Sequence, residues 1–128
     1  MTLESMTPSG EPADEAVATL SDLDETVAFR VWGGDWCPDC RERLPAFATA
    51  LEAAGIDADR VHVYPVDRVD GEKVGPRVDR DDIAAIPTVI VESCRDPTDP
   101  DASGTELARF VEDEGEPIAT WLAERLAE

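Results

Sequence analysis

Hydrophobic and polar positions along the chain change their period several times, and each change marks an expected element. Apolar residues recur at helical spacing in a first, weak segment between residues 12 and 23. A run of β-branched and aromatic residues at 27–32 then predicts a strand. Helical spacing returns after it and predicts a long helix to about residue 54, with Gly55 as a plausible C-cap.

The second half of the chain predicts three strands and a closing helix. Residues 61–66 alternate and are β-branched, residues 86–91 form an apolar run opened by proline, and residues 106–112 alternate again. Pro65 would end the first of these strands early or place it at a sheet edge, because proline cannot donate a ladder hydrogen bond. Pro117 suits the first position of a helix whose apolar residues form one stripe.

Three polar stretches separate these elements. Residues 1–11 lack periodicity and predict a mobile acidic tail, ahead of one domain over residues 12–128. Residues 67–82 are highly charged and predict a loop, with a helical turn near residues 80–85. Residues 92–104 contain two prolines and several aspartates, and they predict a solvated turn.

The order of these elements predicts an α/β fold. Two strands linked by a helix favour a right-handed parallel βαβ unit, and two strands joined by a turn favour an antiparallel ββα unit with the helix that follows. Together they predict a mixed four-stranded sheet with helices on both faces. Pro45 inside the long helix predicts a kink near Arg41, because proline removes one hydrogen bond and clashes with the preceding turn.

The candidate chemistry lies where the first strong strand gives way to the long helix. The sequence there is Trp36-Cys37-Pro38-Asp39-Cys40. Backbone N–H groups in the first turn of a helix lack partners, and the helix dipole is positive at that end. A thiolate is stabilised in this environment, and the thiolate is the nucleophile of thiol–disulfide exchange. The pair therefore predicts a cytosolic redox motif.

The same cysteines could instead hold two corners of a zinc site. Zinc needs about four ligands, and the other candidates, His62 and Cys94, form no second close-spaced pair. Redox chemistry is therefore preferred and no metal is expected. Cys94 is expected to be a small half-buried residue, with a regulatory thiol as the alternative. His62 is expected to face outward or make a structural hydrogen bond.

Composition and charge narrow the class of protein. The chain has 128 residues, enough for one domain, and a formal net charge of −19 from 30 acidic and 11 basic residues. Nucleic-acid binding is not expected, because phosphates need a basic patch. No apolar run approaches a membrane span and no secretory signal is visible, so a cytoplasmic protein without a membrane partner is expected. Lys73 is the only lysine, and this acidic composition resembles that of proteins from salt-in halophiles.

The motif and the order of elements resemble the thioredoxin superfamily over roughly residues 26–127. Beside the Trp-Cys-x-x-Cys turn, Pro45 stands five residues after Cys40, where the family has a proline in the active-site helix. Ile86-Pro87-Thr88 is similar to the family's cis-proline loop. Residues 104–110 resemble the glycine-then-strand segment before the last helix. The resemblance implies a thioredoxin-like fold.

It also implies roles for the residues of the turn. Cys37 would attack the substrate disulfide, and Cys40 would resolve the mixed disulfide. In thioredoxins a buried Asp six residues before the first cysteine relays a proton, but here that position is Val31. Asp39 is the candidate proton acceptor in its place, although its charge opposes thiolate formation. Glu42 is a second candidate, expected to point to solvent.

By the same resemblance, substrate would bind around the first cysteine, at Trp36 and Pro38 and at Ile86 and Pro87 of the proline loop. The expected function is reduction of disulfides in proteins or small molecules. A monomer without a cofactor is expected, which would take its electrons from a thioredoxin-reductase-like donor. The Cys-Pro-Asp-Cys sequence resembles thioredoxin-related reductases and small prokaryotic thioredoxin-like proteins. A non-catalytic binding or chaperone-like module is the alternative, which would not need both cysteines.

Overall fold

The structure of the chain is a computed structural model. The predicted acidic tail, residues 1–11, lies outside the residues that the structure describes. The described residues are 14–23, 26–34, 36–69, 72–75, 78, 83, 85–99, 104–111 and 117–126.

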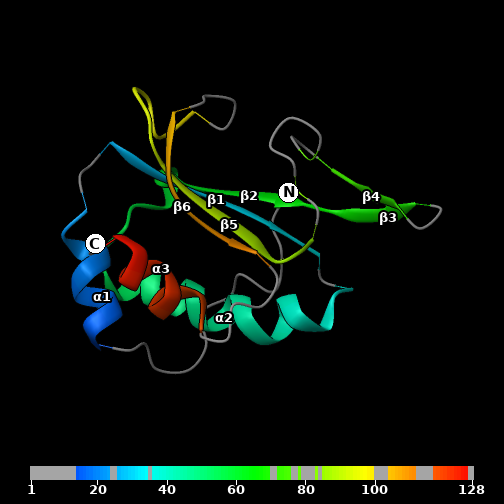
Figure 1. Cartoon of the computed structure of the whole chain (residues 1–128), viewed down its shortest axis with the longest axis horizontal. Coiled ribbons are helices and arrows are strands. Elements are labelled where there is room, and N and C mark those ends of the chain that lie inside the picture. The colour runs from blue at the N-terminus through cyan, green and yellow to red at the C-terminus, as the bar shows by residue number, and fades with distance from the viewer. Residues whose placement is uncertain are drawn as a thin grey trace.

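A mixed four-stranded sheet in the order β2-β1-β5-β6 forms the centre of the fold (Figure 1). β1 (Val27–Gly33) pairs in parallel with β2 (Val61–Pro65) and antiparallel with β5 (Thr88–Ser93). β5 pairs antiparallel with β6 (Thr105–Val111). The predicted combination of a parallel and an antiparallel unit is confirmed. β2 ends at Pro65 and is an edge strand, so both expectations for that proline hold.

Three helices pack together beside this sheet: α1 (Asp14–Ser21), α2 (Pro38–Ala53) and α3 (Ile118–Leu126). Each contacts the other two, and Figure 1 shows all three below the sheet. The prediction of helices on both faces is therefore wrong for the described helices. The opposite face carries the buried Arg30 and Glu92 together with Trp32, which stacks on Tyr64.

Aromatic contacts join the helices to the sheet. The ring of Phe29 on β1 lies 6.4 Å from that of Phe47 on α2. Phe110 on β6 meets Trp121 on α3 edge to face at 5.7 Å. The indole of Trp121 is half-buried and packs against the core, and the guanidinium of Arg125 lies over its ring at 4.7 Å.

α2 runs unbroken from Pro38 to Ala53 with Pro45 inside it. Pro38 suits the first helical position because it has no N–H to leave unpaired. Ala54 is the C-cap, and Gly55 follows it with a φ of 74°, in the left-handed region that glycine adopts without strain. The predicted end near residue 54 is confirmed, but the C-cap is Ala54 and not Gly55. The kink near Arg41 stays a prediction.

Two polar stretches differ from their predictions. The expected loop at 67–82 contains an antiparallel hairpin, β3 (Asp67–Val69) and β4 (Glu72–Val74). Its signal was the Asp-Gly pair between two short alternating runs, a sequence typical of two-residue hairpin turns. The helical turn predicted near 80–85 falls largely outside the described residues. β5 begins and ends two residues later than predicted, so Glu92 belongs to a strand and not to a solvated turn.

Candidate active site

The two cysteines of the motif lie at the start of α2. The chain leaves β1 at Gly33, and the N–H of Cys37 donates to the carbonyl of Gly34 at 3.0 Å. Cys37 is the N-cap residue of α2, with an extended backbone and no capping bond from its side chain. Its side chain is only slightly exposed, whereas Cys40, one turn further on, is fully buried. Cys37 is thus the cysteine that a substrate can approach.

Burial sets the protonation of Cys40. Removal of this thiol from water raises its pKa to about 12. A hydrogen bond from the backbone of Gly34 acts in the opposite direction, but a hydrogen bond with Cys37 and the negative charges of Cys37 and Asp39 raise the pKa further. Cys40 therefore keeps its proton at neutral pH, and both cysteines are free thiols.

The proline loop lies directly beside the first cysteine. The peptide bond between Ile86 and Pro87 is cis. The thiol of Cys37 points to the carbonyl oxygen of Ile86, with 4.0 Å between sulfur and oxygen. Thr88 holds the loop by donating from its hydroxyl to the carbonyl of Ala85 at 2.6 Å. The structure thus brings together two segments that lie 49 residues apart in the chain.

Trp36 forms a wall next to Cys37. Its indole is 42% exposed, and Nε1 donates to the carbonyl of Val66 at 2.7 Å. A Cβ atom at Gly34 would lie 2.5 Å from Nε1, so the indole can occupy this position only because residue 34 has no side chain. Pro38, the residue after Cys37, is also exposed. The sequence singled out Trp36 and Pro38 but not Gly34 and Val66, which hold the indole.

Acidic residues near the dithiol differ in their position relative to Cys40. Val31, which stands where thioredoxins have a buried Asp, is fully buried on the face of β1 that also carries Phe29. Asp39 is half-buried in the first turn of α2, and its charge reaches Cys40. Glu42 is exposed, as expected. Asp39 is therefore the better placed of the two candidate proton acceptors.

The alternative zinc ligands do not join the two cysteines. His62 and Cys94 lie on the other face of the sheet, where the imidazole Nε2 of His62 is 2.7 Å from the carbonyl oxygen of Pro97. In the part of the chain that the structure describes, no group of three or more histidine, cysteine or acidic residues could hold a metal ion. The expectation of a structural hydrogen bond for His62 is confirmed.

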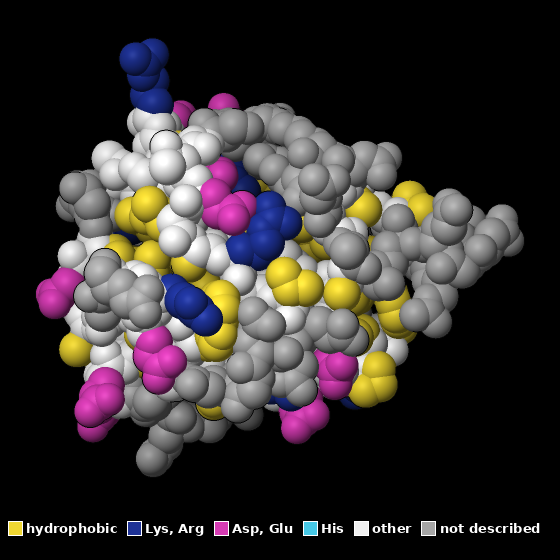
Figure 2. Space-filling view, viewed as in Figure 1, with side chains coloured by type: hydrophobic (Ala, Val, Ile, Leu, Met, Phe, Trp, Pro, Cys, Tyr) yellow, Lys and Arg dark blue, Asp and Glu magenta, His cyan; other side chains and the backbone are white. Residues whose placement is uncertain are grey.

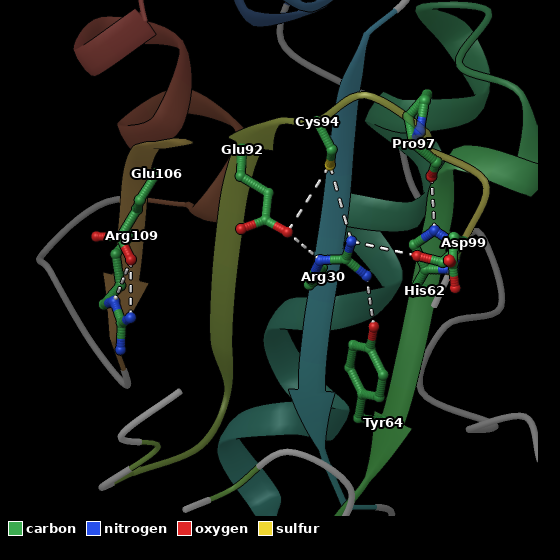
Figure 3. A network of polar contacts seen from close by, with 9 residues as sticks. All are labelled: Arg30, His62, Tyr64, Glu92, Cys94, Pro97, Asp99, Glu106 and Arg109. Carbon is green, nitrogen blue, oxygen red and sulfur yellow. Dashed lines mark hydrogen bonds and ion pairs between the residues drawn. The ribbon is translucent and has the colours of Figure 1, made fainter. Parts of the chain in front are cut away.

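A buried polar network occupies this second face (Figure 3). The guanidinium of Arg30 forms an ion pair with Glu92 and donates to the hydroxyl of Tyr64 at 2.7 Å and to the carbonyl of Asp99 at 3.3 Å. Arg30 and Glu92 also contact the thiol of Cys94, at 3.8 and 3.9 Å. The tyrosine ring stacks on Trp32, with 4.7 Å between ring centroids. The network fastens segment 94–99 to the sheet.

Electrostatics within the network favour a charged arginine and a neutral thiol. Burial alone would lower the pKa of Arg30, but hydrogen bonds and charges from Glu92 and Tyr64 outweigh it and leave the pKa raised. Burial raises the pKa of Cys94, and Glu92 adds to this effect. Cys94 is more deeply buried than the half-buried position predicted for it. Sequence reasoning missed the network, although an arginine inside a run of buried strand residues requires an opposite charge nearby.

The fold and the site together define a class of protein. A mixed four-stranded sheet, a dithiol at the start of the helix after a central strand and a cis-proline beside it fit a thiol–disulfide oxidoreductase. A family model described as thioredoxin matches residues 2–121, and the chain belongs to this family. A search of curated proteins finds no match. None of the described helices has the length and hydrophobicity that crossing a bilayer requires.

Proposed function

We propose that this protein reduces disulfides through Cys37 and Cys40. The observation that carries the proposal is the contrast between the two thiols. Cys37 stands at the helix start, beside the proline loop and 8% exposed, while Cys40 is fully buried with a strongly raised pKa. An accessible nucleophile next to a protected resolving thiol suits a two-step exchange.

In the first step, the thiolate of Cys37 attacks one sulfur of the substrate disulfide. The substrate S–S bond breaks, its other sulfur leaves as a thiolate and takes a proton, and a mixed disulfide with Cys37 forms. In the second step, Cys40 loses its proton and attacks the sulfur of Cys37. The second substrate thiol leaves, and the protein is oxidised to a Cys37–Cys40 disulfide. Two electrons pass from the dithiol to the substrate.

The second step needs a base for the Cys40 proton, because a thiol with a pKa of about 12 is not deprotonated at neutral pH. Asp39 is the acceptor we propose, on the ground of its half-buried position and its electrostatic effect on Cys40. The negative charge of Cys37 also helps to keep Cys40 protonated, and formation of the mixed disulfide removes that charge. Proton transfer is therefore favoured when the second step requires it.

Substrate would lie between two walls of the site. Trp36 and Pro38 are exposed on one side of Cys37, and Ile86 and Pro87 form the other side. We further propose that the protein works as a cytoplasmic monomer, without a cofactor. A separate reductase of the thioredoxin-reductase type would restore the dithiol after each turnover.

The test is reduction of insulin by dithiothreitol at molar salt, with variants at each cysteine. Cys37→Ser should abolish acceleration, because no mixed disulfide can form. Cys40→Ser should form a stable mixed disulfide, seen by mass spectrometry, because the resolving thiol is missing. Full activity of the Cys37→Ser protein would refute the mechanism. Binding of reduced insulin chains without any turnover by the wild type would indicate a binding module instead.

A further inference from the structure

The β3–β4 hairpin begins at the residue that holds the active-site tryptophan. Val66 accepts the indole hydrogen bond of Trp36, and its own N–H donates to Gly33 at 2.8 Å. Asp67, the next residue, is the first of β3. The hairpin is therefore joined to the wall of the site by one peptide unit.

The end of the hairpin returns to the same place. A Cβ atom at Gly75 would lie 2.7 Å from the carbonyl oxygen of Pro65 and 3.3 Å from the Cα of Val66, so the backbone after β4 passes directly against Val66. Asp67 and Val74 are partners in the β3–β4 ladder. Both ends of the hairpin are thus anchored at Val66, and its position is fixed relative to the indole of Trp36.

The chain after the hairpin continues to the other wall of the site. The N–H of Val78 donates to Gly75 at 3.3 Å, and that of buried Ile83 donates to Val78 at 2.9 Å. Three residues further on, the carbonyl of Ile86 faces the thiol of Cys37. The hairpin is therefore inserted between the two segments that border the nucleophile. Figure 1 shows it reaching away from the sheet on the side where α2 begins.

Val74 gives this hairpin an exposed apolar side chain. Among the described residues, the large hydrophobic side chains that are exposed are Trp36 at 42%, Val74 at 50% and Leu107 at 44%. The indole of Trp36 donates to Val66, and Val74 precedes Gly75, whose backbone lies against Val66. Leu107 lies near the far end of β6, away from the residue that pairs with Thr88. One exposed apolar residue is ordinary, but here two lie next to the same segment, which adjoins the nucleophile.

We propose that the β3–β4 hairpin is a second contact surface for polypeptide substrates and that Val74 is its apolar contact. The proposal rests on the proposed function and names its substrate class. A small disulfide such as cystine is confined to the walls around Cys37. An extended polypeptide advances by about 3.3 Å per residue, so residues flanking its reacting cysteine can reach past Trp36 onto the hairpin. The site therefore selects disulfides in polypeptides that have apolar residues near the cysteine.

The test compares three variants on two substrates. Val74→Asp should lower kcat/KM for insulin about tenfold, or roughly 1.4 kcal/mol, because the substrate loses an apolar contact and meets a charge. For cystine it should change kcat/KM by less than about twofold. Val74→Ile should retain activity toward insulin. Leu107→Asp, the matched control, places the same charge at a similarly exposed apolar position and should affect neither substrate.

A binding measurement separates this proposal from the proposed function. Cys37→Ser protein would be titrated with the reduced and alkylated insulin B chain, followed by tryptophan fluorescence. Adding Val74→Asp should weaken binding about tenfold. Equal binding with and without that substitution would overturn the proposal, as would equal losses toward insulin and cystine. If the wild type reduces neither disulfide but binding still depends on Val74, the contact surface stands and the reductase function fails.

Discussion

The guanidinium of Arg30 on β1 is ion-paired with the carboxylate of Glu92 on β5, and both side chains are buried. A buried charge without a partner is strongly unfavourable, whereas a buried pair replaced as a whole by apolar residues is often tolerated. The network therefore has to be considered as one unit, in which each member fixes the protonation and position of the others.

Glu92→Gln is expected to lower the free energy of unfolding by about 3 kcal/mol, because it leaves Arg30 charged and buried. Glu106→Gln is the matched control, since Glu106 pairs with Arg109 on the exposed side of β6 at 2.7 Å. That change should cost less than about 1 kcal/mol. Denaturation by guanidinium chloride measures the free energy of unfolding of both variants. An equal cost for the two variants would show that burial of the Arg30–Glu92 pair has no energetic weight.

Reduced protein at pH 7.5 is expected to react with iodoacetamide at Cys37 well before Cys40 or Cys94. The last two thiols are buried with raised pKa values, about 12 for Cys40, and alkylation requires an accessible thiolate. Peptide mass spectrometry after a timed quench identifies the modified residue. All three should react in denaturant. Similar native rates at the three positions would contradict the structural distinction between the two motif thiols.

The reduced protein is expected to lose stability at alkaline pH. Folding raises the pKa of Cys40 from 9.0 to about 12, so between these values the unfolded chain has released a proton that the folded protein keeps. Unfolding then releases a proton, and the free energy of unfolding falls as the pH rises through this window. Denaturant titrations from pH 8 to 11 measure the slope. Cys40→Ala should show a shallower one, and identical slopes would count against the raised pKa.

Gly34→Ala is expected to displace the indole of Trp36, because its Cβ would lie 2.5 Å from Nε1 and 2.9 Å from the carbonyl oxygen of Val66. The protein should lose about 1–3 kcal/mol of stability. Its kcat/KM should fall for both insulin and cystine, because the wall beside Cys37 moves. Tryptophan fluorescence reports the displacement. Trp36→Phe lacks the hydrogen bond without introducing the clash, so it should lose activity with little loss of stability.

Asp39→Asn is expected to slow the second step of the reaction at neutral pH. Without a carboxylate to accept the Cys40 proton, the mixed disulfide should persist longer and accumulate, as seen by acid quench and mass spectrometry. The defect should diminish at higher pH, where solvent hydroxide replaces the base. Glu42→Gln is the control, because Glu42 is exposed on the next turn. Equal accumulation in both variants would remove Asp39 from the proposed mechanism.

Much of the fold followed from local sequence patterns. The strong strands, the end of the long helix near residue 54 and the edge position of β2 were predicted because period, capping and proline rules act within a few residues. The dithiol was predicted for the same reason. The contact between Cys37 and Ile86 was reached only through the family resemblance, since 49 residues separate them.

The features that were missed depend on partners distant in the chain. Glu92 follows a run of β-formers, but its prediction as a turn residue rested on the prolines beyond it, and only its pairing with Arg30 makes a buried carboxylate tolerable. The segment 67–74 was predicted as a loop because it is highly charged. It forms a hairpin all the same, since both of its ends are anchored at Val66 and it needs no apolar face of its own. The spacing of apolar residues along a helix also does not tell which face of the sheet that helix covers.

Charge on the surface and charge in the interior respond differently to the solvent. On the face shown in Figure 2, acidic side chains of the described residues are scattered, most of them near the edges and one further in, beside basic side chains. Dissolved ions screen such exposed charges over about 10 Å at 0.1 M. The Arg30–Glu92 pair is shielded from those ions by burial. Rising salt should therefore stabilise the protein without weakening its internal pair.

The two faces of the sheet carry separate groups of residues, so each group can be mutated without changing the other. The dithiol and α2 occupy one side, while Arg30, Glu92 and Cys94 occupy the other, where the strand backbone separates the two groups. Substitutions at Pro38 and Asp39 should therefore change the reduction potential of the dithiol and leave the Arg30–Glu92 pair unchanged. A library of variants randomised at those two positions should differ in reduction potential and share the same fold.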